Sequence, residues 1–175
     1  MRAFLAIDVG RPVGPGFGAG SAAAAPSHLT LRFFGEVGPG EIDRILDVLP
    51  AVARGTAPFD LGLEGIGAFP SPERPRVVWL GVGRGRAEVA ALGHRLDAAL
   101  ATVGLPAEGR ELVPHVTLFR VRSRGDRERA RALLDGTLPA PSAAPVRVEE
   151  LALKESTLTP QGPEHLVVRA FPLGG

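Results

Sequence analysis

The chain has 175 residues, of which 45% are hydrophobic, enough to bury the core of one domain or of two small lobes that share a core. Its formal net charge of +1 argues against a protein that binds polyanions through overall charge. The absence of cysteine excludes disulfides, thiolate nucleophiles and sulfur-ligated metals, and no apolar run of about 18 residues could span a membrane. We therefore expect a single bilobal domain, residues 1–175, that is monomeric and cytoplasmic.

Hydrophobic patterns predict alternating strands and helices from the N-terminus onward. Residues 3–9 form a buried first strand rather than a signal peptide, because the apolar run ends at Asp8. The glycine- and proline-rich stretch 10–27 is expected to be a loop. Residues 28–34 alternate as a strand, and residues 39–49 have the spacing of a helix that Pro50 ends or kinks.

Further strands and helices follow along the chain. Residues 59–69 and 74–82 predict a hairpin around the turn "PSPE", followed by a helix over 86–103. Residues 114–121 form another strand, and a short helix begins after an N-cap at Asp126. A strand pair over 146–155 and 165–173 closes the chain across the turn-rich stretch 156–164.

The order strand, helix, strand, strand thus occurs twice, over about 28–83 and 115–171. This order predicts an α+β fold of two pseudo-symmetric lobes, each an antiparallel β-sheet backed by helices, around a central cleft. We expect the first strand of each repeat to face the other across this cleft.

Those two strands carry the same short motif. "SHLTLRFFGEV" (27–37) and "PHVTLFRVRSR" (114–124) share His, an apolar residue, Thr and Leu, in a chain with four histidines and seven threonines. Chance alone would produce two such His-x-Thr pairs about once in a hundred chains of this composition. Because residues i and i+2 of a strand share a face, His28 projects with Thr30, and His115 projects with Thr117.

Two histidines and two hydroxyls suit phosphoryl chemistry. A neutral imidazole can accept a proton from the nucleophile, while an imidazolium donates one to the leaving oxygen. Threonine hydroxyls, and the cation of Arg120, can stabilise the charge that develops on the non-bridging phosphate oxygens. This scheme requires neither metal nor cofactor. Zinc is the alternative, but a catalytic zinc site needs three protein ligands, and neither motif offers another at suitable spacing.

The stretches "HLTLRFFGEV", "RPRVVWLGV", "PHVTLFR" and "GPEHLVVRAFPL" resemble the two-histidine (2H) phosphoesterases, and most closely the bacterial and archaeal RNA 2',3'-cyclic phosphodiesterases, also called 2'-5' RNA ligases. The resemblance implies hydrolysis of 2',3'-cyclic phosphates, on RNA ends or small nucleotides, to 2'-phosphates. It implies His28 as the acid for O3' and His115 as the base for water. Thr30, Thr117 and Arg120 then contact phosphate, and Phe33 lies against the base. The family carries a longer helical segment where this chain has the stretch 10–27.

Several alternatives stay open at this level. The same site can run in reverse as a 2'-5' RNA ligase, or the chain can be a non-catalytic module that binds RNA ends. Phe33 can stack on a base or belong to the core like Phe34, and Arg32 is expected to point with His28. His94 is interpreted as a surface residue and His165 as structural. Apart from Arg120, the arginines of 120–131 are interpreted as a solvated helix face.

Overall fold

A computed structural model describes residues 1–9, 27–109, 111–160 and 162–175. Nine strands and three helices are assigned within these ranges. The predicted loop, residues 10–27, lies outside these ranges except for its last residue, Ser27, which begins the second strand. Within the same ranges, no helix is long and apolar enough to cross a membrane. The elements in chain order are β1 (Arg2–Val9), β2 (Ser27–Glu36), α1 (Pro39–Arg54), β3 (Phe59–Leu61), β4 (Leu63–Phe69), β5 (Val77–Val82), α2 (Arg86–Thr102), β6 (His115–Arg120), α3 (Arg124–Leu134), β7 (Val146–Val148), β8 (Glu150–Thr159) and β9 (Gly162–Pro172).

Seven of the strands form one antiparallel sheet in the order β4-β5-β6-β2-β1-β8-β9, while β3 and β7 pair separately. The predicted α+β class, with antiparallel strands and helices, is confirmed. The expectation that the two motif strands face each other across a cleft is wrong, because β2 and β6 are hydrogen-bonded neighbours at the centre of the sheet.

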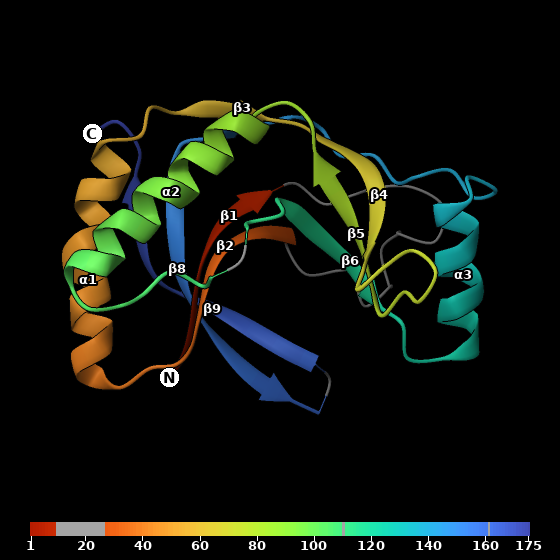
Figure 1. The fold of residues 1–175 in the computed structure, drawn as a ribbon, viewed down its shortest axis with the longest axis horizontal. Coiled ribbons are helices and arrows are strands. Elements are labelled where there is room, and N and C mark those ends of the chain that lie inside the picture. Colours follow the sequence, from red (N-terminus) through yellow and green to blue (C-terminus); the bar gives the residue numbers. More distant parts are fainter. Residues whose placement is uncertain (10–26, 110, 161) are drawn as a thin grey trace.

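The helices divide the sheet into two halves (Figure 1). Helices α1 and α2 pack together on the half that contains β1, β2, β8 and β9, and they share its main hydrophobic core. Helix α3 packs at the other end, where Ala130 and Leu133 join a smaller core with Val78, Leu80 and Leu118. Each half thus has strands backed by helical side chains, and the motif strands lie where the halves meet.

Local differences from the predicted elements have identifiable causes. Helix α1 continues through Pro50 to Arg54, because Leu49, Val52 and Ala53 are buried in the core and compensate for the backbone hydrogen bond that proline cannot donate. Helix α3 begins earlier than predicted. Its N-cap is Ser123, whose hydroxyl accepts from the Asp126 N–H, so Asp126 lies at N3 of a capping box.

The strand boundaries also differ from those predicted. The stretch 59–69 is split into β3, which leaves the main sheet to pair with β7, and β4, which pairs with β5. The stretch 156–164 was predicted as a turn, but β8 runs to Thr159 and β9 starts at Gly162. The resulting long β8–β9 hairpin projects from the body of the protein (Figure 1).

Candidate active site

The two His-x-Thr motifs meet through the pairing of β2 with β6, in which Leu29 lies opposite Val116. Continuing this antiparallel register by one residue in each direction places His28 opposite Thr117 and Thr30 opposite His115. Leu29 and Val116 are fully buried in the main core. The four polar side chains therefore share the opposite face, where two neighbouring strands of one sheet bring them together.

A β-bulge follows each motif. Against β1, strand β2 has one extra residue at Leu31, and against β5, strand β6 has one extra residue at Leu118. A bulge interrupts the alternation of side chains between the two faces. The residue five positions past each histidine therefore comes to the face of the motif: Phe33 pairs with Phe4, and Arg120 with Val77.

Phe33 lies on the open face beside His28. Its side chain is 42% exposed, and its ring stacks on that of Phe4 with centroids 5.6 Å apart and planes 9° apart. The Phe33 N–H donates to Glu108 Oε1 at 3.1 Å, which fixes the backbone below the ring. Phe33 is therefore an exposed, anchored aromatic surface, whereas Phe34 packs against the main core.

The bulges also direct the residue before Phe33 and the residue before Arg120 toward the helices. The expectation that Arg32 points with His28 is wrong, because Arg32 pairs with Leu5 of the buried face and its Nη1 lies 3.1 Å from Asp97 Oδ1 on α2. Phe119, at the equivalent position, lies under the guanidinium of Arg129 on α3 at 4.6 Å. Arg120 is exposed, and its register past the bulge places it on the side of the histidines; its contact with phosphate stays a prediction.

His115 is held in one orientation and one tautomer. Its Nδ1 lies 2.7 Å from the carbonyl oxygen of Val113. Because a carbonyl oxygen only accepts, Nδ1–H donates, and Nε2 of the neutral ring carries a free lone pair. The rings of Phe69 and Trp79 flank it at centroid distances of 4.9 and 5.8 Å. Burial lowers the pKa of His115, and the Val113 carbonyl partly offsets this.

His28 lies in an environment that disfavours the charged imidazole. Its ring packs against Phe4 at 5.1 Å and at right angles to His165 at 5.0 Å. Burial, followed by the proximity of His165 and Lys154, lowers the pKa of His28 to about 4, although Asp8 acts in the opposite direction. At neutral pH the imidazole is therefore uncharged in the ligand-free site.

Two residues beside His28 were not identified from the sequence. His165 was interpreted as structural, yet one side of its ring contacts Phe4 and His28 while the residue remains exposed. Lys154, only 6% exposed, donates from Nζ to Asp8, the residue that pairs with His28 across β1 and β2. Lys154 is the only lysine among twenty basic residues, and that was the one available signal. His165 had none, because its position depends on the course of the β8–β9 hairpin.

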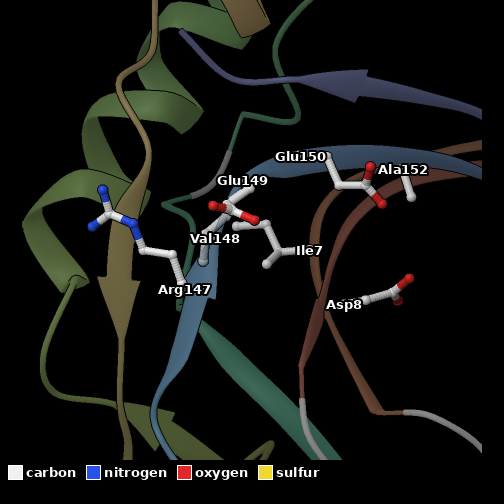
Figure 2. Close-up of a pocket in the computed structure, with 7 residues that line it drawn as sticks. All are labelled: Ile7, Asp8, Arg147, Val148, Glu149, Glu150 and Ala152. Atoms are coloured by element: carbon white, nitrogen blue, oxygen red, sulfur yellow. The ribbon is translucent and has the colours of Figure 1, made fainter.

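The surroundings of the site, in the described part of the chain, include a pocket but no cluster of metal ligands. Within the ranges that the structure describes, no three His, Cys, Asp or Glu side chains gather as metal ligands. A pocket of about 260 Å³ at the end of β1 touches the site only through Asp8. Figure 2 shows it lined also by Glu149 and Glu150, with the Arg147 side chain pointing away from them. Arg147 is ion-paired with Asp60.

A central antiparallel sheet with paired His-x-Thr strands defines a two-histidine phosphoesterase. The chain belongs to the 2'-5' RNA ligase superfamily, whose family model matches residues 7–158. An RNA 2',3'-cyclic phosphodiesterase of Methanothermobacter thermautotrophicus is 39% identical over 83% of this chain and 78% of its own length. One of Archaeoglobus fulgidus is 32% identical over 98% and 99%.

Solved structures agree with this assignment. A Thermus thermophilus protein superposes with a TM-score of 0.68 and 28% identity, covering 100% of this chain and 99% of its own. Escherichia coli LigT in complex with 3'-AMP superposes with a TM-score of 0.72 and 25% identity, covering 99% and 98%. The predicted family is therefore confirmed.

Proposed function

We propose that this protein hydrolyses RNA 2',3'-cyclic phosphate ends to 2'-phosphates by general acid-base catalysis. The observation that carries the proposal is the register of β2 and β6, which places two imidazoles and two threonine hydroxyls on one open face. The curated relatives named RNA 2',3'-cyclic phosphodiesterase support the substrate class. Phosphate would lie between the two histidines, in contact with Thr30 and Thr117.

His115 is the base in this proposal. Its Nε2 carries the free lone pair, because Nδ1–H is engaged by the Val113 carbonyl. The lowered pKa keeps this lone pair available at neutral pH. His115 therefore takes a proton from water as the water oxygen attacks phosphorus, a role typical of neutral histidine.

His28 is the acid, which requires a charged imidazole. With a pKa of about 4, only about one molecule in a thousand carries this proton at pH 7 in the free site. A bound phosphodiester would add a negative charge beside the ring and so raise the pKa of His28. The substrate thus promotes protonation of the group that donates to the departing O3'.

The remaining groups bind the substrate. Arg120 contributes a permanent positive charge on the face of the histidines and stabilises the non-bridging oxygens in the transition state. The exposed ring of Phe33 stacks against the base of the terminal nucleotide. 2'-5' ligation would use the same groups, with a 5'-hydroxyl in place of water as the nucleophile and O3' again as the leaving group, in line with the description of the superfamily.

The test is turnover of 2',3'-cyclic nucleotides in the presence of EDTA. We expect 2'-phosphate as the product, and losses of about a hundredfold or more in His28→Gln and in His115→Gln. The double variant should be little slower than either single variant, because the two groups act as a unit. Loss of activity in EDTA that zinc or manganese restores would refute the mechanism. Binding without turnover would instead favour a module that only recognises RNA ends.

A further inference from the structure

A second cavity, of about 340 Å³, lies between the β4–β5 turn and α3, which Figure 1 shows beside each other. Its walls come from two segments some fifty residues apart in the sequence, and four of its seven lining residues are arginines. They are Glu73, Arg74, Pro75 and Arg76 from the turn, and Val121, Arg127 and Arg131 from the end of β6 and from α3.

Within the described ranges, these four arginines have no carboxylate partner. Elsewhere, Arg84 and Arg147 pair with Asp60, and Arg124 pairs with Glu128. Among the residues that the structure describes, none of the four pocket arginines forms an ion pair with an acidic side chain. Glu73, the one acidic residue in the wall, is hydrogen-bonded to Ser71, which lowers its pKa and keeps it ionised. Four positive charges thus face one negative charge.

This concentration of charge is unusual for the chain and costs stability. The whole protein has a formal net charge of only +1, so the surplus at the pocket is balanced by acidic residues elsewhere. Arg127 and Arg131 are four residues apart on α3, and a like-charge pair at this spacing weakens a helix. A bound anion would relieve this repulsion, and guanidinium groups suit phosphate in particular.

The pocket lies just past the end of β6, the strand that carries His115, and the side chain of Val121 packs with the smaller core on the α3 side of the sheet. Arg120 lies on the face of the histidines, and the next residue, Val121, lines the pocket and donates its N–H to the Arg76 carbonyl at 2.9 Å. At about 3.3 Å per residue, Val121 is roughly 20 Å from His115 along the strand. A mononucleotide at the histidines does not span this separation, whereas an RNA chain does and carries one phosphate per nucleotide.

We propose that the pocket formed by Arg74, Arg76, Arg127 and Arg131 binds backbone phosphates of single-stranded RNA while the terminal phosphate reacts at the histidines. The inference rests on the proposed function and specifies its substrate as an RNA end rather than a free cyclic nucleotide. The pocket contributes to binding only, so the chemical step on a mononucleotide is independent of it.

The test compares two substrates, a 2',3'-cyclic mononucleotide and a short oligoribonucleotide ending in 2',3'-cyclic phosphate. In Arg127→Gln/Arg131→Gln, we expect kcat/KM for the oligonucleotide to fall about tenfold or more, with the mononucleotide unchanged within about twofold. The slope of log(kcat/KM) against log[salt] for the oligonucleotide should become shallower by about 1.4, the value for two single-strand phosphate contacts. Arg74→Gln/Arg76→Gln, on the other wall, should reproduce both effects.

The matched control is Arg54→Gln/Arg95→Gln, which removes the same charge from exposed positions of α1 and α2 at the far end of the molecule. It should leave both substrates unaffected. Unchanged kinetics on the oligonucleotide in both pocket variants, or an equal fall on both substrates, would overturn the inference; the former result is also expected if the pocket serves an acidic protein. Failure of the wild type to hydrolyse either substrate would refute the proposed function itself.

Discussion

The protonation of His28 is the strongest constraint that a single residue places on the mechanism. Burial and the neighbouring Lys154 and His165 lower its pKa to about 4, and burial also lowers the pKa of His115. Hydrolysis requires one proton shared unequally between the two rings, on His28 and not on His115. The free protein therefore disfavours a proton on His28, and bound phosphate must promote it.

This constraint predicts two different pH profiles. The parameter kcat/KM reports the free protein, in which both pKa values are lowered. The decline of kcat/KM with rising pH should therefore be centred below pH 6.5. Because kcat reports the complex, in which phosphate favours the charged ring, its basic limb should lie at higher pH. Initial rates with a 2',3'-cyclic mononucleotide from pH 4 to 9 measure both limbs. A kcat/KM that stays constant up to pH 8 would contradict the assignment.

His165 should influence His28 electrostatically. In His165→Phe the packing of an aromatic ring against His28 is retained, but the charge that lowers the pKa of His28 is removed. We expect the pKa of His28 to rise in this variant. NMR titration of the imidazole resonances measures it, and with only four histidines each signal can be assigned by substitution. His94→Gln, at an exposed position of α2, is the control. An unchanged His28 titration would reduce His165 to a packing residue.

At the scale of strands, the sequence predicted which motif residues lie together, but not the direction of the side chains that follow each motif. Period-two alternation was sufficient for His28, Thr30, His115 and Thr117, because each pair precedes its bulge. It failed for Arg32, which lies just past the bulge at Leu31. A bulge depends on pairing with a neighbouring strand, here β1 for one motif and β5 for the other, so one strand's own sequence does not reveal it.

Neighbouring strands also support His115, and Gly67 is essential to that support. Gly67 on β4 pairs with Trp79 on β5, and a Cβ at Gly67 would lie 2.2 Å from atoms of the indole ring. In Gly67→Ala the indole must therefore move, which removes one of the two rings that flank His115.

We expect this variant to lower kcat while remaining folded. Trp79 is the only tryptophan, so a change in its fluorescence reports the displacement directly. Gly40→Ala is the control, since nothing lies within 4 Å of a Cβ there. Displaced fluorescence with an unchanged kcat would show that Trp79 does not position His115.

The two bulges give Phe33 and Arg120 equivalent positions but different roles. Phe33→Ala should raise KM for cyclic nucleotides and leave kcat largely intact, because a stacked base is held equally in the ground and transition states. Arg120→Gln should instead lower kcat, because charge on the phosphate grows in the transition state. Steady-state kinetics of the two variants separates these effects, and the same kinetic change in both would argue against the division of roles.

At the scale of the whole molecule, the α+β class was predictable and the arrangement of the sheet was not. The repeat of strand, helix, strand, strand suggested one sheet per repeat. In the structure, β4 and β5 join β6 of the second repeat, while β8 and β9 join β2 through β1. This exchange makes one sheet with both motifs at its centre. It also brings the arginines of the β4–β5 turn against those of α3, which the sequence predicted only as a solvated helix face.

Burial of neutral histidines on this sheet should make folding sensitive to acid. The folded pKa of His28 is about 4 and its unfolded pKa about 6.5, so below pH 6.5 the unfolded chain binds a proton that the folded protein resists. The stabilising contribution is therefore complete above pH 6.5 and is lost as pH falls toward 4. For His28 the loss is up to about 3 kcal/mol. The lowered pKa values of His115 and His165 act in the same direction.

The variant His28→Asn isolates the contribution of His28 to the pH dependence of stability, because asparagine occupies a similar volume and does not titrate. Between pH 7 and pH 4, the free energy of unfolding of the wild type should fall by up to about 3 kcal/mol more than that of the variant. Urea denaturation at the two pH values measures both, and the carboxylates, common to the two proteins, cancel in the comparison. Equal losses would mean that His28 is protonated in the folded protein well above pH 4, in which case it is ready to act as the acid before any phosphate binds.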